Sequence, residues 1–112
     1  MKKIEAIIRT EQFSDLHKEL LTVGINGLTV SEVAGYGSQK GMTGIYRGNI
    51  YDVNLLPKIK VELVVSDKNY SNIITIIKNT CSTGKAGDGK IFVYELENVI
   101  RIRTGDEGIE AI

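Results

Sequence analysis

The sequence is short of the residues that build catalytic and metal sites. It has one cysteine, one histidine and no tryptophan among 112 residues. Cys81 cannot form an intramolecular disulfide bond, and His17 cannot by itself supply a histidine-based metal site. The carboxylates Glu32, Glu62 and Asp88 are scattered along the sequence. Apart from His17, no histidine is present to serve as the base of a Ser-His-Asp or Cys-His set. These scarcities disfavour an enzyme, and we interpret Cys81 as a packed apolar residue and His17 as a helix-edge residue without a role.

The chain also lacks an excess of charge and a long apolar run. Its 14 basic and 14 acidic residues give a net charge of zero, which disfavours a general binder of nucleic acids or anionic membranes. No apolar run reaches the roughly 18 residues of a transmembrane helix. The two lysines at the start resemble a signal peptide, but Glu5 and Arg9 interrupt the apolar segment that such a peptide needs. We therefore expect a cytoplasmic chain.

The pattern of apolar residues predicts one domain, residues 1–112, of the α+β class. Helical spacing predicts helices over 11–23 and 69–80, the latter capped by Ser66. Strand-like alternation and β-branched residues predict strands over 3–9, 28–34, 58–65, 90–96 and 99–103. The order matches a ferredoxin-like βαββαβ fold, an antiparallel four-stranded sheet with both helices on one face. The other face would carry Ile7 and Val64, with Phe92 or Val93, and we expect it to self-associate.

Residues 35–57 form the longest stretch without clear periodicity, and they are rich in glycine. We expect an irregular functional loop, too long for a hairpin turn, because compact domains rarely keep such a loop otherwise. Gln39, Lys40 and Lys58 could bind a small anion. Tyr46 and Tyr51 could anchor a partner or accept a covalent modification, or they could simply pack against the loop.

A second glycine-rich loop, residues 83–89, precedes Lys90. With Lys90 it matches the G-x-x-x-x-G-K string of a phosphate-binding P-loop, but Ile91 stands where a P-loop needs serine or threonine, and the helix-to-strand order is reversed. A P-loop NTPase is therefore rejected. Glycines still allow backbone N–H groups to converge on an anion, with Lys90 adding a positive charge. A plain turn would be the better interpretation if this loop stood alone.

Arg101 and Arg103 change that balance. On a strand, residues two apart share one face, and paired guanidinium groups are suited to bidentate phosphate recognition. Each arginine taken singly would be a solvated surface residue. Together with Lys90 and the glycine loop, the pair favours an oligophosphate ligand such as a nucleotide.

The motifs resemble those of the PII family of nitrogen-regulatory signal proteins. Residues 83–93, TGKAGDGKIFV, are similar throughout to the C-terminal signature of that family. Residues 39–41, 46–48 and 56–58, together with Tyr51, resemble its T-loop, which would span about 37–55 here. The resemblance covers essentially the whole chain, including the segment 99–112.

The resemblance implies a homotrimer that binds ATP or ADP in the clefts between subunits, with the two arginines coming from a neighbouring subunit. The implied nucleotide-binding residues are Thr29, Gly35, Gly37, Ser38, Val64, Thr83, Gly87, Asp88, Gly89, Lys90, Arg101 and Arg103. It also implies that 2-oxoglutarate binds beside Mg-ATP, with Gln39 holding Mg²⁺. The implied 2-oxoglutarate-binding residues are Gly37, Gln39, Lys40, Gly41, Lys58 and Gly87.

The T-loop of such a protein would control partners, either an ammonium transporter or an enzyme or regulator of nitrogen metabolism. Four positions depart from the usual pattern. Ser38 stands where the family usually has an arginine that reaches the phosphates, and Asn49-Ile50 replaces the pair that usually precedes a uridylylated Tyr51. Thr10 replaces a usual proline. Uridylylation of Tyr51 thus stays an expectation. Some family members are phosphorylated on a serine at the position of Asn49, and asparagine cannot be modified in that way.

Two other functions suit the same fold. A ferredoxin-like nucleic-acid-binding module needs exposed aromatic residues on its central strands, but 3–9 and 58–65 contain none. A small hydrolase of the acylphosphatase type needs an arginine-asparagine site in an early loop, and no suitable one is present. A signal protein is therefore the preferred interpretation.

Overall fold

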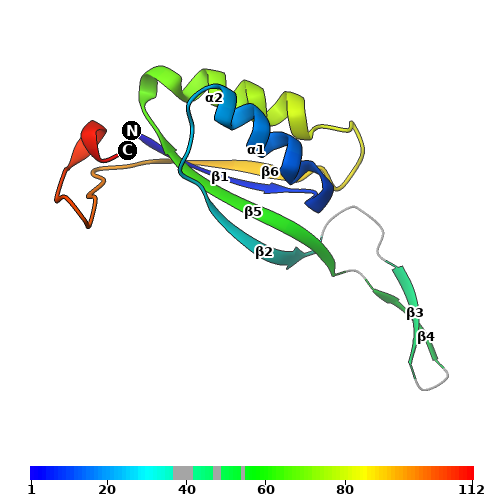
Figure 1. Ribbon diagram of the computed structural model, residues 1–112. Coiled ribbons are helices and arrows are strands. Elements are labelled where there is room, and N and C mark those ends of the chain that lie inside the picture. The colour runs from blue at the N-terminus through cyan, green and yellow to red at the C-terminus, as the bar shows by residue number, and fades with distance from the viewer. Residues whose placement is uncertain (37–41, 47–48, 54) are drawn as a thin grey trace.

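The computed structural model describes residues 1–36, 42–46, 49–53 and 55–112, and its centre is an antiparallel sheet (Figure 1). The strands lie in the order β2-β5-β1-β6, and every neighbouring pair is antiparallel. Their bounds are β1 Lys2–Ile8, β2 Thr29–Gly35, β5 Leu56–Val65 and β6 Lys90–Glu95.

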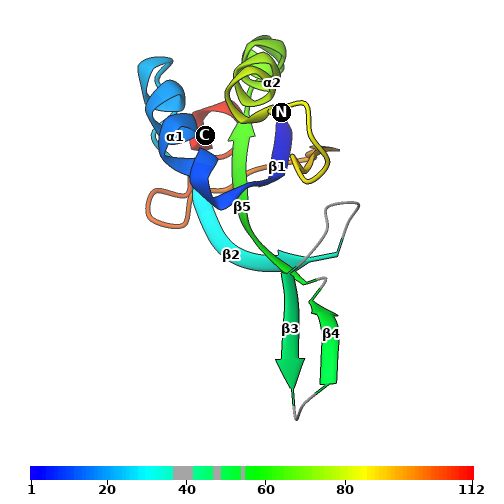
Figure 2. The same cartoon turned by 90° about the vertical axis from the view of Figure 1, so that its right-hand side faces the viewer.

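Both α-helices cover the same face of this sheet (Figures 1 and 2). A 3₁₀ turn, η1, precedes the first helix and another, η2, ends the chain. Their bounds are η1 Thr10–Gln12, α1 Phe13–Thr22, α2 Asp67–Cys81 and η2 Gly108–Ala111. The βαββαβ order and the one-sided placement of the helices confirm the predicted ferredoxin-like fold. No helix within the described ranges is long and apolar enough to cross a membrane.

The core forms where the alternating strands face the helices. In each of the two central strands, alternate residues are buried, as the sequence pattern predicts. The helices contribute Leu16, Leu20, Ile73 and Ile77, each at most 1% exposed. The buried strand residues are Ile4, Ala6, Ile8, Val61, Leu63 and Val65. The apolar pattern of the sequence thus fixes which sheet face carries the helices.

The ends of the helices follow ordinary capping chemistry. The Ser66 hydroxyl accepts a hydrogen bond from the Asn69 amide at 3.3 Å, which confirms the predicted cap of α2. Gly24 takes a positive φ of 84° directly after α1 and its cap. The Ile25 amide then donates to the Leu20 carbonyl at 3.0 Å, which closes the helix end. Val23, the last residue of the predicted helix 11–23, follows the end of α1 and is 42% exposed.

The face of the sheet away from the helices mixes charged and apolar side chains. Paired residues on neighbouring strands share a face, and Phe92 pairs with Glu5, whereas Val93 pairs with the buried Ile4. Phe92 rather than Val93 therefore lies on this face with Ile7 and Val64. Ion pairs also cross the face, between Lys3 and Glu62 at 3.5 Å and between Lys60 and Glu5 at 3.6 Å.

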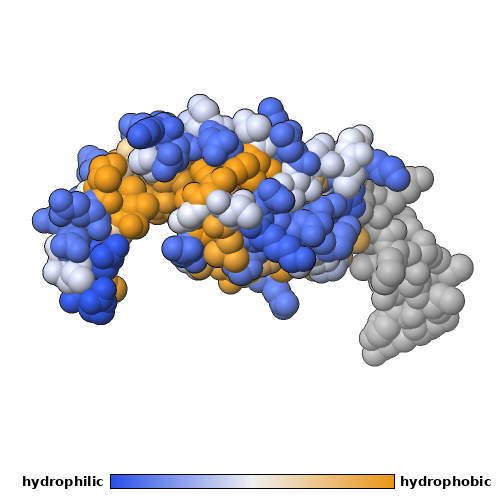
Figure 3. Space-filling model, turned by 45° about the horizontal axis from the view of Figure 1, so that its top comes forward, coloured by the Kyte–Doolittle hydropathy of each residue, from blue (hydrophilic) through white to orange (hydrophobic). Residues whose placement is uncertain are grey.

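Apolar side chains are exposed along β6 and in the C-terminal segment. Phe92 and Tyr94 are each more than two-fifths exposed, and Ile102 is fully exposed. Figure 3 shows apolar surface in the middle of one face and toward the C-terminal segment, and more hydrophilic surface near the grey end of the molecule. Such exposure is typical of surfaces that meet another protein.

The prediction of an irregular loop over 35–57 is wrong for most of its described residues. Strands β3 Met42–Tyr46 and β4 Asn49–Val53 pair antiparallel as a separate two-stranded sheet. This hairpin projects away from the main sheet (Figures 1 and 2). Gly44 interrupts the alternation of β3, which hid the strand. The missed signal was two residues, ending in glycine, between two strand-like runs.

The predicted strand over 99–103 is also wrong. Only a single bridge joins Ile100 to Glu107, and the chain there folds back on itself. The Gly105 amide donates to the Arg101 carbonyl at 2.8 Å, and Gly105 has a φ of 75°. Arg101 and Arg103 therefore do not share a strand face, because both lie within the turn that runs from Arg101 to Gly105.

Candidate functional site

A pocket of about 370 Å³ lies where the base of the hairpin meets the second glycine loop. The ends of β2 and β5 form one side of it, the loop residues form another, and β1 and β6 contribute apolar side chains. We call it the loop-base pocket. Its lining residues are Ile7, Gly35, Tyr36, Leu56, Lys58, Ala86, Gly87, Gly89, Lys90 and Phe92. Five predicted ligand-binding residues therefore meet in one place, namely Gly35, Lys58, Gly87, Gly89 and Lys90.

The carboxylate of Asp88 organises the glycine loop from within. It accepts hydrogen bonds from the Thr83 amide at 2.8 Å, from the Thr83 hydroxyl at 2.5 Å and from the Gly84 amide at 2.9 Å. These bonds, those of Thr83 first, hold the pKa of the Asp88 carboxyl well below its usual range. The expectation that the loop amides converge on an anion is thus met, for Thr83 and Gly84, by the chain's own carboxylate.

Gly89 allows the loop to pass very close to β1. Its φ is 95°, and a Cβ atom built there would lie 1.6 Å from the Ile7 carbonyl oxygen. No side chain fits in that space, so only glycine permits this close approach to β1. Gly87 and Lys90, on either side of this contact, line the loop-base pocket.

Two cations hold consecutive carbonyl groups of the loop. Arg9 Nη2 donates to the Ala86 carbonyl at 2.8 Å, and Lys58 Nζ donates to the Gly87 carbonyl at 2.6 Å. Arg9 Nε also donates to Asp88 at 3.1 Å. Burial, followed by the nearby Arg9 charge, lowers the pKa of Lys58. The Lys58 ammonium is thus already desolvated in part and stands next to a second positive charge, an arrangement that favours an anionic ligand.

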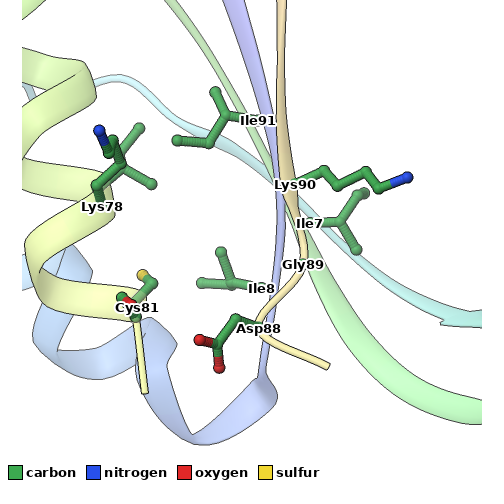
Figure 4. A pocket seen from close by; sticks show the side chains of 10 residues that line it. Ile7, Ile8, Lys78, Cys81, Asp88, Gly89, Lys90 and Ile91 are labelled. Carbon is green, nitrogen blue, oxygen red and sulfur yellow. The ribbon is translucent and has the colours of Figure 1, made fainter. Parts of the chain in front are cut away.

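Lys90 adds a positive charge on the side of β6 opposite α2. In Figure 4 the Lys90 side chain and Ile7 extend to the same side, away from the helix. A smaller pocket of about 310 Å³ lies on the helix side, where Cys81, Ile8 and Ile91 form part of its wall. Cys81 is 5% exposed, which confirms that it is a packed apolar residue, and this burial raises the pKa of its thiol to about 11.

Thr29 and Val64 lie in a third pocket, of about 620 Å³, together with Val99 and Ile112. This pocket is at the Lys3 end of β1, whereas the loop-base pocket is at the Ile7 end. Six of the predicted nucleotide-binding residues are thus divided between two separate pockets of one chain, Thr29 and Val64 here and Gly35, Gly87, Gly89 and Lys90 in the loop-base pocket.

The two arginines of the C-terminal segment lie far from the glycine loop in one chain. Figure 1 shows that segment and the loop at opposite ends of the sheet. Arg101 forms an ion pair with Asp106 at 3.5 Å, which fixes it within its own turn. The chain by itself does not bring Arg101 or Arg103 to Lys90.

Several predicted residues lie outside the described part of the chain. The loop residues of both ligand sets that fall there are Gly37, Ser38, Gln39, Lys40 and Gly41. Tyr51 is placed in β4 by its backbone alone. Within the described ranges, no cluster of three His, Cys, Asp or Glu side chains could hold a metal ion. The Mg²⁺ ligand expected at Gln39 therefore stays a prediction.

The residues at the pocket suit an anion with several negative charges. Lys58 and Lys90 supply positive charge, and Gly87 and Gly89 line the same pocket. Arg9 is the functional residue that sequence reasoning missed. The sequence pattern placed Arg9 only at the end of the predicted strand 3–9. Nothing in the spacing of residues indicated a contact with Asp88.

Comparison with known proteins places the whole chain in one group. The family model described as "Nitrogen regulatory protein P-II" matches residues 1–106. A "Nitrogen regulatory protein P-II" of Pasteurella multocida is 55% identical, and one of Rhizobium meliloti is 52% identical. "Nitrogen regulatory protein P-II 1" of Escherichia coli K12 is also 52% identical. Each alignment spans 112 residues and covers 100% of both chains.

The close approach of Gly89 to Ile7 in β1 leads to a prediction about stability. Replacing Gly89 with alanine should destabilise the chain by about 2 kcal/mol or more, since it combines a clash with Ile7 and a strained φ. Gly84→Ala is the matched control. Gly84 has a φ of 81° but nothing within 4 Å of a built Cβ, so only the cost of the backbone conformation, about 1 kcal/mol, should appear. Urea denaturation followed by circular dichroism measures both, and equal losses would contradict the close approach.

The Asp88 hydrogen bonds predict a pH dependence of stability. Because the folded-state pKa lies below the unfolded value of about 3.9, the stabilisation is fully present above about pH 5 and is lost as the pH falls toward the folded pKa. Asp88→Asn should therefore be less stable than the wild type at pH 7, and the difference should shrink in acid. Denaturation midpoints between pH 3 and pH 7 test this, with the exposed Asp15→Asn on α1 as control. A difference independent of pH would refute the assignment.

Proposed function

The chain belongs to the nitrogen regulatory protein P-II family, and we propose that it is a signal protein that binds ATP or ADP together with 2-oxoglutarate. The observation that carries this proposal is the loop-base pocket. There Lys58, from the base of the hairpin, donates to the carbonyl of Gly87 in the glycine loop. A ligand at that junction touches both the loop that would bind phosphates and the hairpin that would meet partners.

We propose that the phosphates lie against the glycine loop. Lys90 would form a charge-assisted contact with them, and the main chain at Gly87 and Gly89, which line the same pocket, would lie beside them. Asp88 would act indirectly, because its carboxylate is engaged with Thr83, Gly84 and Arg9. Thr29 and Val64 would line the other half of the cleft from a second subunit's pocket.

The 2-oxoglutarate carboxylate would pair with Lys58. A lysine ammonium has three donors, so Lys58 can keep its bond to Gly87 while it binds a ligand. Mg²⁺ held by Gln39 would supply a shared positive centre between nucleotide and 2-oxoglutarate, and the main chain of 37–41 would complete the site. Binding would shift the population of hairpin conformations, since the pocket lies at the base of the hairpin.

We propose that the hairpin is the part that partners contact. It projects from the body of the chain, so a partner can reach it without disturbing the core (Figure 2). The partner would be an ammonium transporter or an enzyme or regulator of nitrogen metabolism in the cytoplasm. Tyr51, in β4, is the residue that a uridylylating enzyme would modify. The chain would act by binding and not by catalysis.

Calorimetry with ATP, ADP and 2-oxoglutarate tests the ligands. We expect ATP to bind the wild type, and 2-oxoglutarate to bind much more tightly with Mg-ATP present than without nucleotide. Lys90→Ala and Arg103→Ala should each lose about 1.5–3 kcal/mol of ATP binding, because each removes a charge-assisted contact. Exposed Lys18→Ala on α1 is the control. Undiminished ATP binding by both variants would refute the pocket, and equal 2-oxoglutarate binding without nucleotide would refute the shared Mg²⁺.

The proposed cleft requires a neighbouring subunit to supply Arg101 and Arg103. We therefore expect a trimer, with a mass near three times the 12.3 kDa of one chain. The exposed apolar residues of β6 and of the C-terminal segment would be covered in it. Light scattering coupled to size exclusion measures the mass, and a value for a single chain would rule out a cleft between subunits.

A further inference from the structure

We propose that Arg9 is a positioning residue of the loop-base pocket. It holds the glycine loop independently of Lys58, so that the loop keeps its shape when the Lys58 ammonium turns toward a ligand carboxylate. This inference rests on the proposed function, because it concerns how the nucleotide and 2-oxoglutarate share one site.

The contacts of Arg9 place it at the centre of the loop. Arg9 follows β1 and stands just before η1, with an extended backbone at φ −64° and ψ 143°. Its side chain is only 13% exposed. The guanidinium donates to Asp88 at 3.1 Å and to the Ala86 carbonyl at 2.8 Å, so one rigid planar group holds two points of the loop.

Arg9 is also connected to the start of the loop through Asp88. The Asp88 carboxylate, which accepts from Arg9, also accepts hydrogen bonds from the amides of Thr83 and Gly84. Arg9 is therefore connected to both ends of the loop through a single carboxylate. Removing the guanidinium would leave Asp88 with less positive charge beside it and Ala86 without this donor.

The arrangement with Lys58 explains why two cations are needed. Arg9 holds the Ala86 carbonyl while Lys58 holds the next one, that of Gly87. If Lys58 were the only cation on this stretch, a lengthening of its bond to Gly87 during ligand binding would weaken the only cationic contact there. With Arg9 in place, that lengthening weakens only one of two adjacent contacts. Among the described residues, the charged groups near Lys58 include Arg9 and the carboxylates of Glu11 and Asp88.

Arg9 acts through the loop and not by touching the ligand. Among the described residues it is absent from the lining of the loop-base pocket, whereas Lys58, Ala86 and Gly87 all line it. Gly87 belongs to the residue sets proposed for both ligands. A loop held by Arg9 would therefore couple the two binding events, and that coupling is reciprocal by thermodynamic necessity.

The first test uses the full chain without ligand. Arg9→Gln should accelerate hydrogen exchange at the amides of Thr83 and Gly84 by about tenfold or more, because Asp88 loses a charged partner. Arg9→Lys, which keeps the charge but not the planar fork, should recover part of the protection. Exposed Lys18→Gln is the control and should change nothing. Unchanged exchange in Arg9→Gln would overturn the proposal, and if that variant does not fold, full protection in Arg9→Lys would overturn it too.

The second test measures binding. In Arg9→Gln we expect ATP affinity to fall about tenfold, and the enhancement of 2-oxoglutarate binding by Mg-ATP to fall with it. The double variant with Asp88→Asn should lose less ATP affinity than the sum of the two single variants, because the two residues share one contact. Additive losses, or an unchanged enhancement, would overturn the proposal. A wild type that binds neither ligand would refute the proposed function instead, while the exchange experiment would still decide whether Arg9 holds the loop.

Discussion

The candidate site depends on the hydrogen bonds that the Asp88 carboxylate accepts. A glycine-rich loop has little side-chain packing of its own, and here an internal anion replaces that packing. The carboxylate gathers the amides that would otherwise point to solvent, and Arg9 compensates its charge. The loop is thereby fixed without a bound ligand, so the cost of ordering it need not be met when a ligand binds.

This arrangement determines which charges remain to face a ligand. Asp88 is turned inward toward its own loop, while Lys58 and Lys90 line the pocket. Lys90 can reach the open side of the sheet because Gly89 lets β6 begin in direct contact with β1. The close approach of Gly89 to β1, possible only for glycine, thus lies between the structural anion Asp88 and the pocket-lining cation Lys90.

The sequence predicted the elements whose buried residues recur with a regular period, and it did not predict the elements that depend on single contacts. Alternation and helical spacing located β1, β5, α1 and α2 and their buried faces, since burial imposes a period on the sequence. The hairpin was missed because Gly44 interrupts the alternation of β3 and leaves no clear strand period there. The segment after Val99 failed for the opposite reason, because a short β-like run was overruled by the turn at Gly105.

The site itself could be predicted in its residue types but not in its assignment of roles. The glycine loop, Lys58 and Lys90 were all identified, whereas the contact between Arg9 and Asp88 joins residues 79 positions apart and leaves no trace in local spacing. The same limit applies between chains. Val64 pairs with Lys3 and Lys90 pairs with Ile7, so their two pockets lie roughly 13 Å apart along β1 at 3.3 Å per residue. In the proposed function, these two pockets would be the two halves of a cleft. They would form complete clefts only if copies associated head to tail, and a ring that closed in this way would give every copy the same pair of contacts.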